Sequence, residues 1–298
     1  TRDGVGVITL NNPPVNALGA GVRQGVADLV ERARADGGVQ AIVLNGAGRC
    51  FCGGADIREF GQPPIPPSLP EVIDIIESCP KPVVAALHGV AYGGGFELPL
   101  GCHFRIAAPS ARVALPEVTL GLIPGAGGTQ RLPRLIGVEA AVGVILSGKP
   151  VAATSALSMG IVDEIVDGDL VDAAIAFALA CADKERPPTR VRDLEVAEPE
   201  PGFFEDGRKK IARRARGLIA PWHCIESIEN TTKLPFDEGL KKERALFLEC
   251  RESEQSKGQR HFFFAEREAA KIPDVPRDTP ALAIQSVAVI GCGTMGAG

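Results

Sequence analysis

The chain has 298 residues, of which 45% are hydrophobic and 23% charged, and it carries a formal net charge of −5. This composition is typical of a globular protein with room for one large domain or two smaller ones. The acidic balance, without a basic stripe interleaved with aromatic residues, argues against nucleic-acid binding. No apolar run reaches the roughly 18 residues of a membrane-spanning helix, so we expect no membrane span.

The first part of the chain alternates short apolar strands with helical segments. We expect strands at 5–10, 41–44, 83–87 and 104–108. We expect helices over 20–35, from 72 toward Pro80, and from Glu97 to Gly101. Strands and helices that alternate in this way predict an α/β architecture with crossover connections.

The texture of the sequence changes after about residue 186. Residues 187–207 are rich in Pro, Glu, Asp and Arg and predict an irregular insertion, whereas residues 208–270 are mainly helical in pattern. A proline-rich stretch over 272–281 indicates a linker. The eight cysteines show no paired metal-ligand spacing, so we expect no metal site and a reducing compartment.

Two glutamates stand in apolar surroundings. Glu97 follows the triglycine Gly93-Gly94-Gly95, and Glu117 follows Leu115-Pro116. A carboxylate that folds into such surroundings is costly to keep charged unless it is paired or used. Two carboxylates that converge in a dry site can hold water and move protons, so we expect Glu97 and Glu117 to carry the chemistry.

Two glycine-rich segments are candidates for binding a developing negative charge. Without a Cβ, the backbone N–H groups of Gly93-Gly94-Gly95 can approach a ligand closely, and Cys52-Gly53-Gly54-Ala55-Asp56 offers a second such turn. Each run on its own is equally compatible with an ordinary tight turn. Asp56 is expected to make an Asx turn or a helix cap that supports its loop.

Together these motifs resemble the crotonase (enoyl-CoA hydratase/isomerase) superfamily. The resemblance rests on Phe51–Ile57, on the triglycine before Glu97, and on Pro116-Glu117 with Ile123–Pro133. It covers roughly residues 1–186 and resumes at Glu238–Phe247. With the insertion and the glycine motif near the end, the chain is similar to the N-terminal part of the type-1 peroxisomal-like multifunctional enzymes of β-oxidation. In that family a hydratase/isomerase half precedes a 3-hydroxyacyl-CoA dehydrogenase half.

The resemblance implies a fold and four parts. The fold class is α/β, with a ClpP/crotonase-like ββα spiral core, a C-terminal helical region and a truncated start of a Rossmann domain. The expected parts are a crotonase core over 1–186, an insertion with linker helices that complete the crotonase unit over 187–271, a linker over 272–285, and a truncated first strand and glycine-rich turn of an NAD-binding domain over 286–298.

The resemblance also implies residue roles and an activity. The backbone N–H groups of Ala55 and Gly94 would bind the thioester oxygen of an acyl-CoA substrate. Glu97 would activate the water that attacks C3 of a 2-enoyl-CoA, and Glu117 would give a proton to C2. The expected enzyme is an enoyl-CoA hydratase of fatty-acid β-oxidation with Δ3,Δ2-enoyl-CoA isomerase activity. A pure isomerase and a non-catalytic acyl-CoA-binding module are the alternatives.

A dinucleotide-binding motif stands near the end of the chain. Gly291, Gly293 and Gly296 follow the apolar run Val287–Ile290 in the spacing of a Rossmann fingerprint. The helix, second strand and acidic residue that complete the fingerprint do not follow. We therefore expect no useful NAD binding and no dehydrogenase activity, with NAD serving only the full-length parent protein.

The remaining expectations concern partners and compartment. Hydration needs no cofactor, since the CoA thioester is itself the substrate. The superfamily resemblance implies either a monomer or a trimer-based homo-oligomer. Bacterial cytoplasm and the peroxisome both fit as compartments.

Overall fold

A computed structural model describes residues 1–59, 61–183, 188–213, 215–269, 272, 275–276, 279–280, 282–291 and 293. The strands are β1 (Val5–Leu10), β2 (Ala41–Gly46), β3 (Val83–Leu87), β4 (Val90–Tyr92), β5 (Phe104–Ala107), β6 (Arg112–Ala114), β7 (Val151–Ala152) and β8 (Glu164–Ile165). The α-helices of the core are α1 (Ala20–Ala35), α2 (Leu69–Glu77), α3 (Gly94–Leu100), α4 (Gly128–Ile136), α5 (Val138–Ser147), α6 (Ala153–Met159) and α7 (Leu170–Ala182). Within these described residues, no helix has both the length and the apolar character that crossing a membrane requires.

Beyond α7 the described chain is mainly helical, as the sequence predicts for 208–270, but helix also begins at Phe203, inside the stretch expected to be irregular. The elements are α8 (Phe203–Ile211), α9 (Ala220–Glu229), α10 (Phe236–Glu252) and α11 (Glu254–Ala269). Short 3₁₀ turns complete the set: η1 (Ile57–Glu59), η2 (Glu117–Leu120), η3 (Val191–Asp193) and η4 (Asn230–Thr232).

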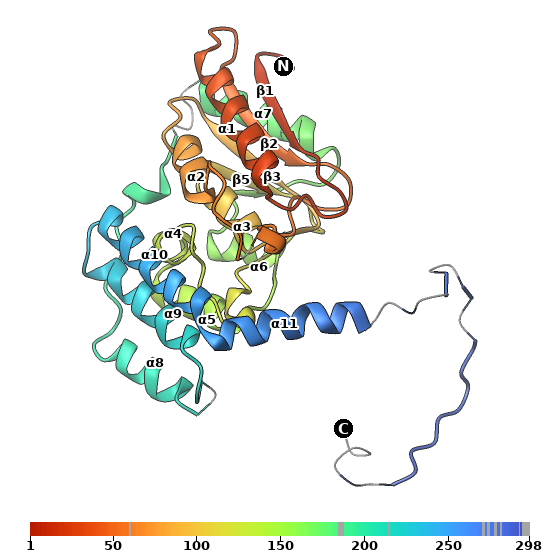
Figure 1. The fold of residues 1–298 in the computed structure, drawn as a ribbon. Coiled ribbons are helices and arrows are strands. Elements are labelled where there is room, and N and C mark those ends of the chain that lie inside the picture. Colours follow the sequence, from red (N-terminus) through yellow and green to blue (C-terminus); the bar gives the residue numbers. More distant parts are fainter. Residues whose placement is uncertain are drawn as a thin grey trace. The chain divides into compact units, whose positions relative to one another are not determined.

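The main sheet is five-stranded and parallel, in the order β1-β2-β3-β5-β8. Successive side chains of a strand point to opposite faces, and here both faces are buried. Ile42 and Leu44 of β2 join the core beneath α1 and α2, whereas Ala41 and Val43 face α7. Figure 1 shows α1 on one side of this sheet, with α7 behind it. The α/β class predicted from the sequence is therefore confirmed.

A second, three-stranded sheet in the order β4-β6-β7 positions the candidate site. β4 and β6 are parallel, and β6 and β7 are antiparallel. A bridge between Cys52 and Ala91 attaches the glycine-rich loop after β2 to this sheet. Its hydrogen bonds run from Cys52 N–H to Val90 O (3.0 Å) and from Tyr92 N–H to Cys52 O (3.1 Å).

Two helices begin earlier than the sequence pattern indicates. α2 starts at Leu69 rather than Val72, because Ser68 starts a capping turn in which its N–H donates to Glu71 Oε2 (2.6 Å). α3 starts at Gly94 rather than Glu97, directly after Gly93 at φ +53°. The second difference matters for chemistry, since it makes Gly94 N–H a free donor of the first helical turn.

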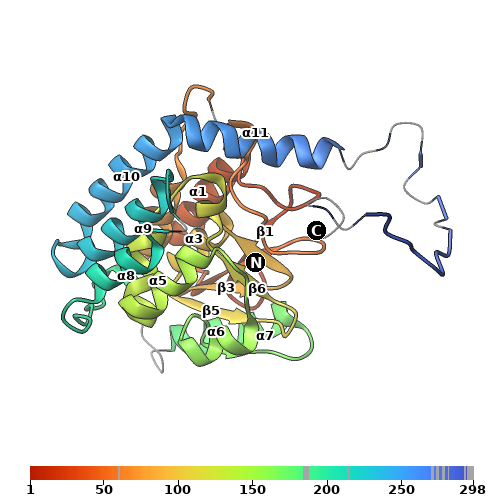
Figure 2. The same cartoon turned by 90° about the horizontal axis from the view of Figure 1, so that it is seen from below.

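The helix α9 lies beside α5 in both views (Figures 1 and 2), and both α9 and α10 contact α4. Core-facing positions of α10 recur at three- and four-residue spacing: Phe236, Gly239, Glu243, Leu246 and Cys250. Such spacing gives a helix one buried face. A glutamate is therefore inserted among the apolar residues of that face.

The described residues divide into two compact units, 1–260 and 261–298, so the division falls within α11. The apolar run Val287–Ile290, expected within the first strand of an NAD-binding domain, is not a strand in the structure: residues 282–291 form no strand, and Val287 and Ile290 are 81% and 100% exposed. A strand of a parallel sheet needs a neighbouring strand to pair with, and no strand among the described residues pairs with this segment. The predicted boundary at 186/187, residue 271 at the next boundary, and Gly296 lie outside the described residues, and the four-part division stays a prediction.

Candidate active site

Glu97 is buried in α3 with its carboxylate held by two backbone donors. Glu97 is positioned by β4 and the sharp turn at Gly93, which lead into α3. The carbonyl of Gly93 accepts the N–H of Glu97 at 2.9 Å. Oε1 of Glu97 accepts the N–H groups of Ala126 (2.7 Å) and Gly128 (2.9 Å). Two donors on one oxygen occupy its lone pairs and favour the ionised form, leaving Oε2 available for another partner.

Glu117 reaches the same place from η2, just after β6. The residue as a whole is half-buried, but its Oε2 is shielded from solvent and has no hydrogen-bond partner among the described residues. Its Oε1 lies against the triglycine, since a Cβ built on Gly93 would stand only 2.9 Å from it. A buried carboxyl oxygen without a donor is costly when ionised, which favours the protonated acid.

The environments of the two glutamates separate their protonation behaviour. Burial raises the pKa of Glu97, while the N–H groups of Ala126 and Gly128 and the charge of Arg131 act against that rise. Burial, followed by repulsion from Glu97, raises the pKa of Glu117 well above the ordinary value. Like charges held close together cannot both be ionised cheaply. The site therefore favours an ionised Glu97 beside a protonated Glu117.

The two expected oxyanion donors are brought together by the Cys52–Ala91 bridge. A Cβ built on Gly94 would lie 3.4 Å from Ala55 N and 3.6 Å from Ala55 Cβ, with Leu69 Cδ2 on the other side at 2.7 Å. Neither Ala55 N–H nor Gly94 N–H donates a hydrogen bond within the part of the chain that the structure describes. Two neighbouring unpaired N–H groups beside Gly93 and Glu117 are suited to binding a carbonyl oxygen that gains negative charge.

A third glutamate, which our reading of the sequence did not assign, belongs to the same cluster. Glu243 is 1% exposed and accepts the N–H groups of Gly127 (2.6 Å) and Thr129 (3.0 Å). Burial and repulsion from Glu97 raise the pKa of Glu243 to about 8, against the opposing hydrogen bonds from Thr129 and Gly127. Its place on the apolar face of α10 was the available signal, because a glutamate there must be paired inside the core.

Other residues considered from the sequence have local roles. Asp56 Oδ1 accepts the N–H of Arg58 (3.0 Å), which confirms the expected Asx turn. Gly291 has no regular secondary structure and a φ of +102°, and Gly293 lies in a bend. The described residues hold no cluster of three or more His, Cys, Asp or Glu side chains that could bind a metal.

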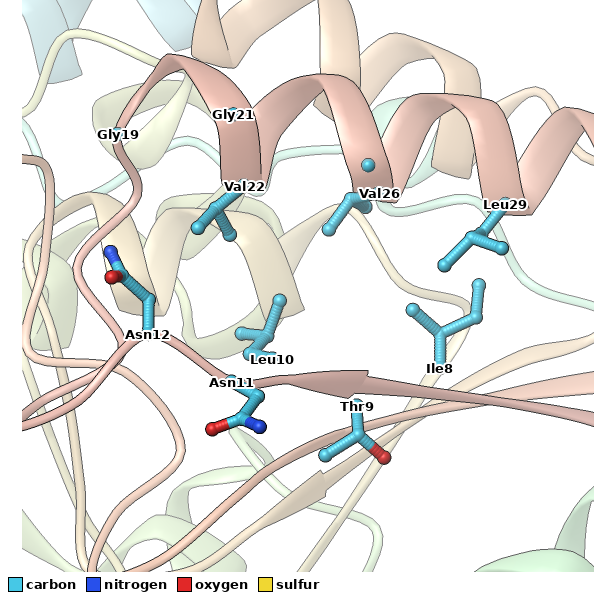
Figure 3. A pocket seen from close by; sticks show the side chains of 11 residues that line it. Ile8, Thr9, Leu10, Asn11, Asn12, Gly19, Gly21, Val22, Val26 and Leu29 are labelled. Carbon is cyan, nitrogen blue, oxygen red and sulfur yellow. The ribbon is translucent and has the colours of Figure 1, made fainter.

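A separate surface hollow lies between β1 and α1. Figure 3 shows Val22, Val26 and Leu29 of α1 facing Ile8 and Leu10 of β1, with Asn11 and Asn12 at one end. None of its lining residues is titratable, and it shares no lining residue with the glutamate cluster. Of the surface hollow and the glutamate cluster, only the glutamate cluster can therefore carry acid–base chemistry.

Comparison with known proteins agrees with this arrangement. Residues 1–195 match the family model described as enoyl-CoA hydratase/isomerase. The chain belongs to the enoyl-CoA hydratase/isomerase family, the crotonase family that the motifs indicate.

Individual relatives narrow the comparison. The chain is 46% identical over 300 residues to a peroxisomal bifunctional enzyme of Danio rerio and 40% identical over 304 residues to that of Homo sapiens. These matches cover 99% and 100% of this chain but 42% of each relative, so the chain spans about two fifths of their length. A solved carnitinyl-CoA hydratase from Mycobacterium avium is 31% identical with a TM-score of 0.65, covering 90% of this chain and 94% of that one. The crotonase fold expected from the motifs is confirmed.

Proposed function

We propose that this chain hydrates trans-2-enoyl-CoA thioesters to 3-hydroxyacyl-CoA in fatty-acid β-oxidation. The observation that carries the proposal is the site geometry: two N–H donors on Oε1 of Glu97, a buried Oε2 of Glu117 with no partner among the described residues, and two unpaired N–H groups beside them. This geometry favours an ionised Glu97 and a protonated Glu117. Family membership supports it, as do relatives whose names include fatty-acid β-oxidation multifunctional proteins. Hydration needs no metal or redox cofactor, because the thioester carbonyl is activated by hydrogen bonds alone.

The proposed chemistry starts at the thioester oxygen. The N–H groups of Ala55 and Gly94 donate to this oxygen and polarise the enoyl system, so that C3 becomes electrophilic. Oε2 of Glu97 takes a proton from water as the water oxygen bonds to C3. The charge that moves onto the thioester oxygen stays between the two donors as an enolate.

Glu117 completes the addition by giving its proton to C2. The enolate collapses back to the thioester, leaving Glu97 protonated and Glu117 ionised. A proton passing from Glu97 to Glu117 restores the starting pair. We propose that both carboxyl groups act from one side of the substrate, so that hydroxyl and hydrogen add to the same face of the double bond.

Isomerisation of 3-enoyl-CoA substrates would use the other protonation state of the same pair, in which Glu97 holds the shared proton and Glu117 is ionised. Ionised Glu117 would remove a proton from C2 and return it at C4, while Ala55 and Gly94 hold the enolate. Glu97 is then the partner that only hydration requires. A pure isomerase would lack the water-activating step at Glu97.

The test is the loss of enoyl-thioester absorbance when crotonyl-CoA is added. Glu97→Gln and Glu117→Gln should each lower kcat for hydration by about 10²- to 10⁴-fold, because each removes an acid–base group. Glu97→Gln should retain more isomerase activity toward a 3-enoyl-CoA than Glu117→Gln. Glu238→Gln, an exposed glutamate of α10, is the matched control and should leave both rates unchanged.

Other outcomes separate the alternatives. Binding of crotonyl-CoA without absorbance loss would make the chain an acyl-CoA-binding module. Isomerisation without hydration would make it a pure isomerase. Full hydration by Glu97→Gln would refute the role given to Glu97.

The proposed compartment follows from the names of the relatives, whereas the assembly rests on the superfamily resemblance alone. Their names place them in peroxisomes or glyoxysomes, and we carry the peroxisome over to this chain. The monomer and the trimer-based assembly differ at least threefold in mass, which light scattering of the purified protein distinguishes.

A further inference from the structure

Four consecutive N–H groups of one turn are divided between two buried carboxylates. Along residues 126–129, the N–H groups of Ala126 and Gly128 point to Glu97, and those of Gly127 and Thr129 point to Glu243. The turn is the beginning of α4, where the first N–H groups have no partner within the helix. Each carboxylate therefore holds the turn in the orientation that the other one needs.

The conformation of the turn leaves little freedom for another arrangement. Gly127 has φ +99°, a left-handed conformation that residues with a Cβ rarely adopt. A Cβ on Gly127 would collide with Nη1 of Arg131, which itself donates to Ala126 O (3.3 Å). A Cβ on Gly128 would lie 2.9 Å from Glu97 Oε1. The backbone conformation thus fixes the alternating directions of the N–H groups, and Glu243 accepts the two that do not point to Glu97.

Glu243 is itself held in place by the Thr129 side chain of α4, which is in turn hydrogen-bonded to α9. Its Oε2 also accepts the Thr129 hydroxyl, and that hydroxyl lies 2.6 Å from Ser227 Oγ of α9. Gln130 Nε2 donates to Ser227 O (2.9 Å) and tightens the same corner. Because Thr129 and Ser227 can exchange donor and acceptor roles, this corner keeps its hydrogen bonds whether Glu243 is ionised or protonated.

Resting on the proposed function, we propose that Glu243 is a positioning residue for hydration. It acts through the Ala126–Thr129 turn and keeps two N–H groups aimed at Oε1 of Glu97. With Oε1 fixed, Oε2 is the oxygen left to orient the attacking water. Glu243 has no direct contact with the proposed reacting atoms, so its effect falls on the water-activating step rather than on thioester binding.

The test uses Glu243→Gln, which keeps the size of the side chain. Its single carbonyl oxygen can accept from Gly127 or from Thr129, while its NH₂ group opposes the other N–H. We expect kcat for crotonyl-CoA hydration to fall by about 10- to 10²-fold, the scale of an ångström-level misplacement of a catalytic group. KM should stay unchanged, and isomerisation of a 3-enoyl-CoA should fall less than hydration. Glu238→Gln on the exposed face of α10 is again the matched control.

Each result bears on the inference separately from the proposed function. A wild-type chain that does not hydrate crotonyl-CoA removes the proposed function itself. A wild-type chain that hydrates normally, together with a folded Glu243→Gln variant of equal kcat, overturns only the role of Glu243. An equal fall in hydration and isomerisation, or a rise in KM with kcat unchanged, also overturns it.

If Glu243→Gln fails to fold, Thr129→Val decides the matter. This variant removes the hydroxyl donor to Glu243 Oε2 and leaves both backbone N–H groups in place. A lowered kcat at constant KM supports the positioning role. Unchanged kcat in folded Thr129→Val overturns it.

Discussion

Replacing Gly94 by alanine would put a methyl group into the space between the two proposed oxyanion donors. The added Cβ would lie 3.4 Å from Ala55 N and 2.7 Å from Leu69 Cδ2. An oxygen that accepts from Ala55 N–H must itself lie about 2.9 Å from that nitrogen. The methyl carbon and the thioester oxygen would therefore compete for the same region.

The size of the effect follows from losing one donor. Removal of one oxyanion-hole hydrogen bond costs about 3–4 kcal/mol of transition-state stabilisation, or about 10²- to 10³-fold in kcat. The fold should tolerate the change, because the contact is with the end of the flexible Leu69 side chain. Alanine is also favoured over glycine in a helix by up to about 1 kcal/mol, which offsets the crowding.

The assay combines hydration of crotonyl-CoA with thermal unfolding. Gly143→Ala in α5 is the matched control, since a Cβ there meets nothing within 4 Å. Gly94→Ala should lose hydration while its unfolding temperature stays near that of Gly143→Ala. A folded Gly94→Ala variant that hydrates crotonyl-CoA within a few-fold of the wild-type rate would refute the placement of the oxyanion at Gly94 and Ala55.

Three further predictions concern charge. Hydration should show a bell-shaped pH profile, in which the acidic limb reports protonation of Glu97 and the alkaline limb reports loss of the Glu117 proton. Both limbs should lie above the ordinary glutamate pKa, because both pKa values are raised. If the residual activity of Glu117→Gln keeps the alkaline limb at the same pH, this assignment is contradicted. Glu77→Gln should lower the free energy of unfolding in urea by about 3–5 kcal/mol, because it leaves the buried Arg131 guanidinium without the carboxylate that it contacts at 2.7 Å. An effect below about 1 kcal/mol would speak against a buried ion pair. The pKa of Glu243 is raised to about 8 in the folded state, so its contribution to the free energy of unfolding is greatest below the unfolded pKa and is lost as the pH rises toward 8. Urea titrations from pH 5 to pH 9 should therefore show a free energy of unfolding that varies less with pH for Glu243→Gln than for wild type. Parallel curves for the two proteins would rule this out.

Much of the fold could be predicted from local sequence. The apolar runs at Val83–Leu87 and Ala41–Leu44 identify buried parallel strands, because such strands are covered on both faces and lack alternation. The end of the chain misled the same reasoning. Val287–Ile290 has an equally apolar pattern, but it is exposed and forms no strand. A strand is stable only when it pairs with neighbouring strands, and no strand among the described residues pairs with this segment.

The sequence by itself determined which residues were candidates for chemistry. Glu97 and Glu117 stand out because a carboxylate among apolar residues is costly without a partner or a use, and the glycine runs mark where backbone N–H groups can be exposed. Only the tertiary structure decided what surrounds them. Ala55 and Gly94 become neighbours through the Cys52–Ala91 bridge.

The clearest case is Glu243. Its hydrogen bonds to Gly127 and Thr129 span 116 and 114 residues of sequence, so no local pattern could indicate them. They exist because α10 packs beside the N-terminus of α4, where unpaired N–H groups attract a buried carboxylate. Local chemistry identified the two candidate acids; long-range packing placed the proposed oxyanion donors beside them and added the third carboxylate.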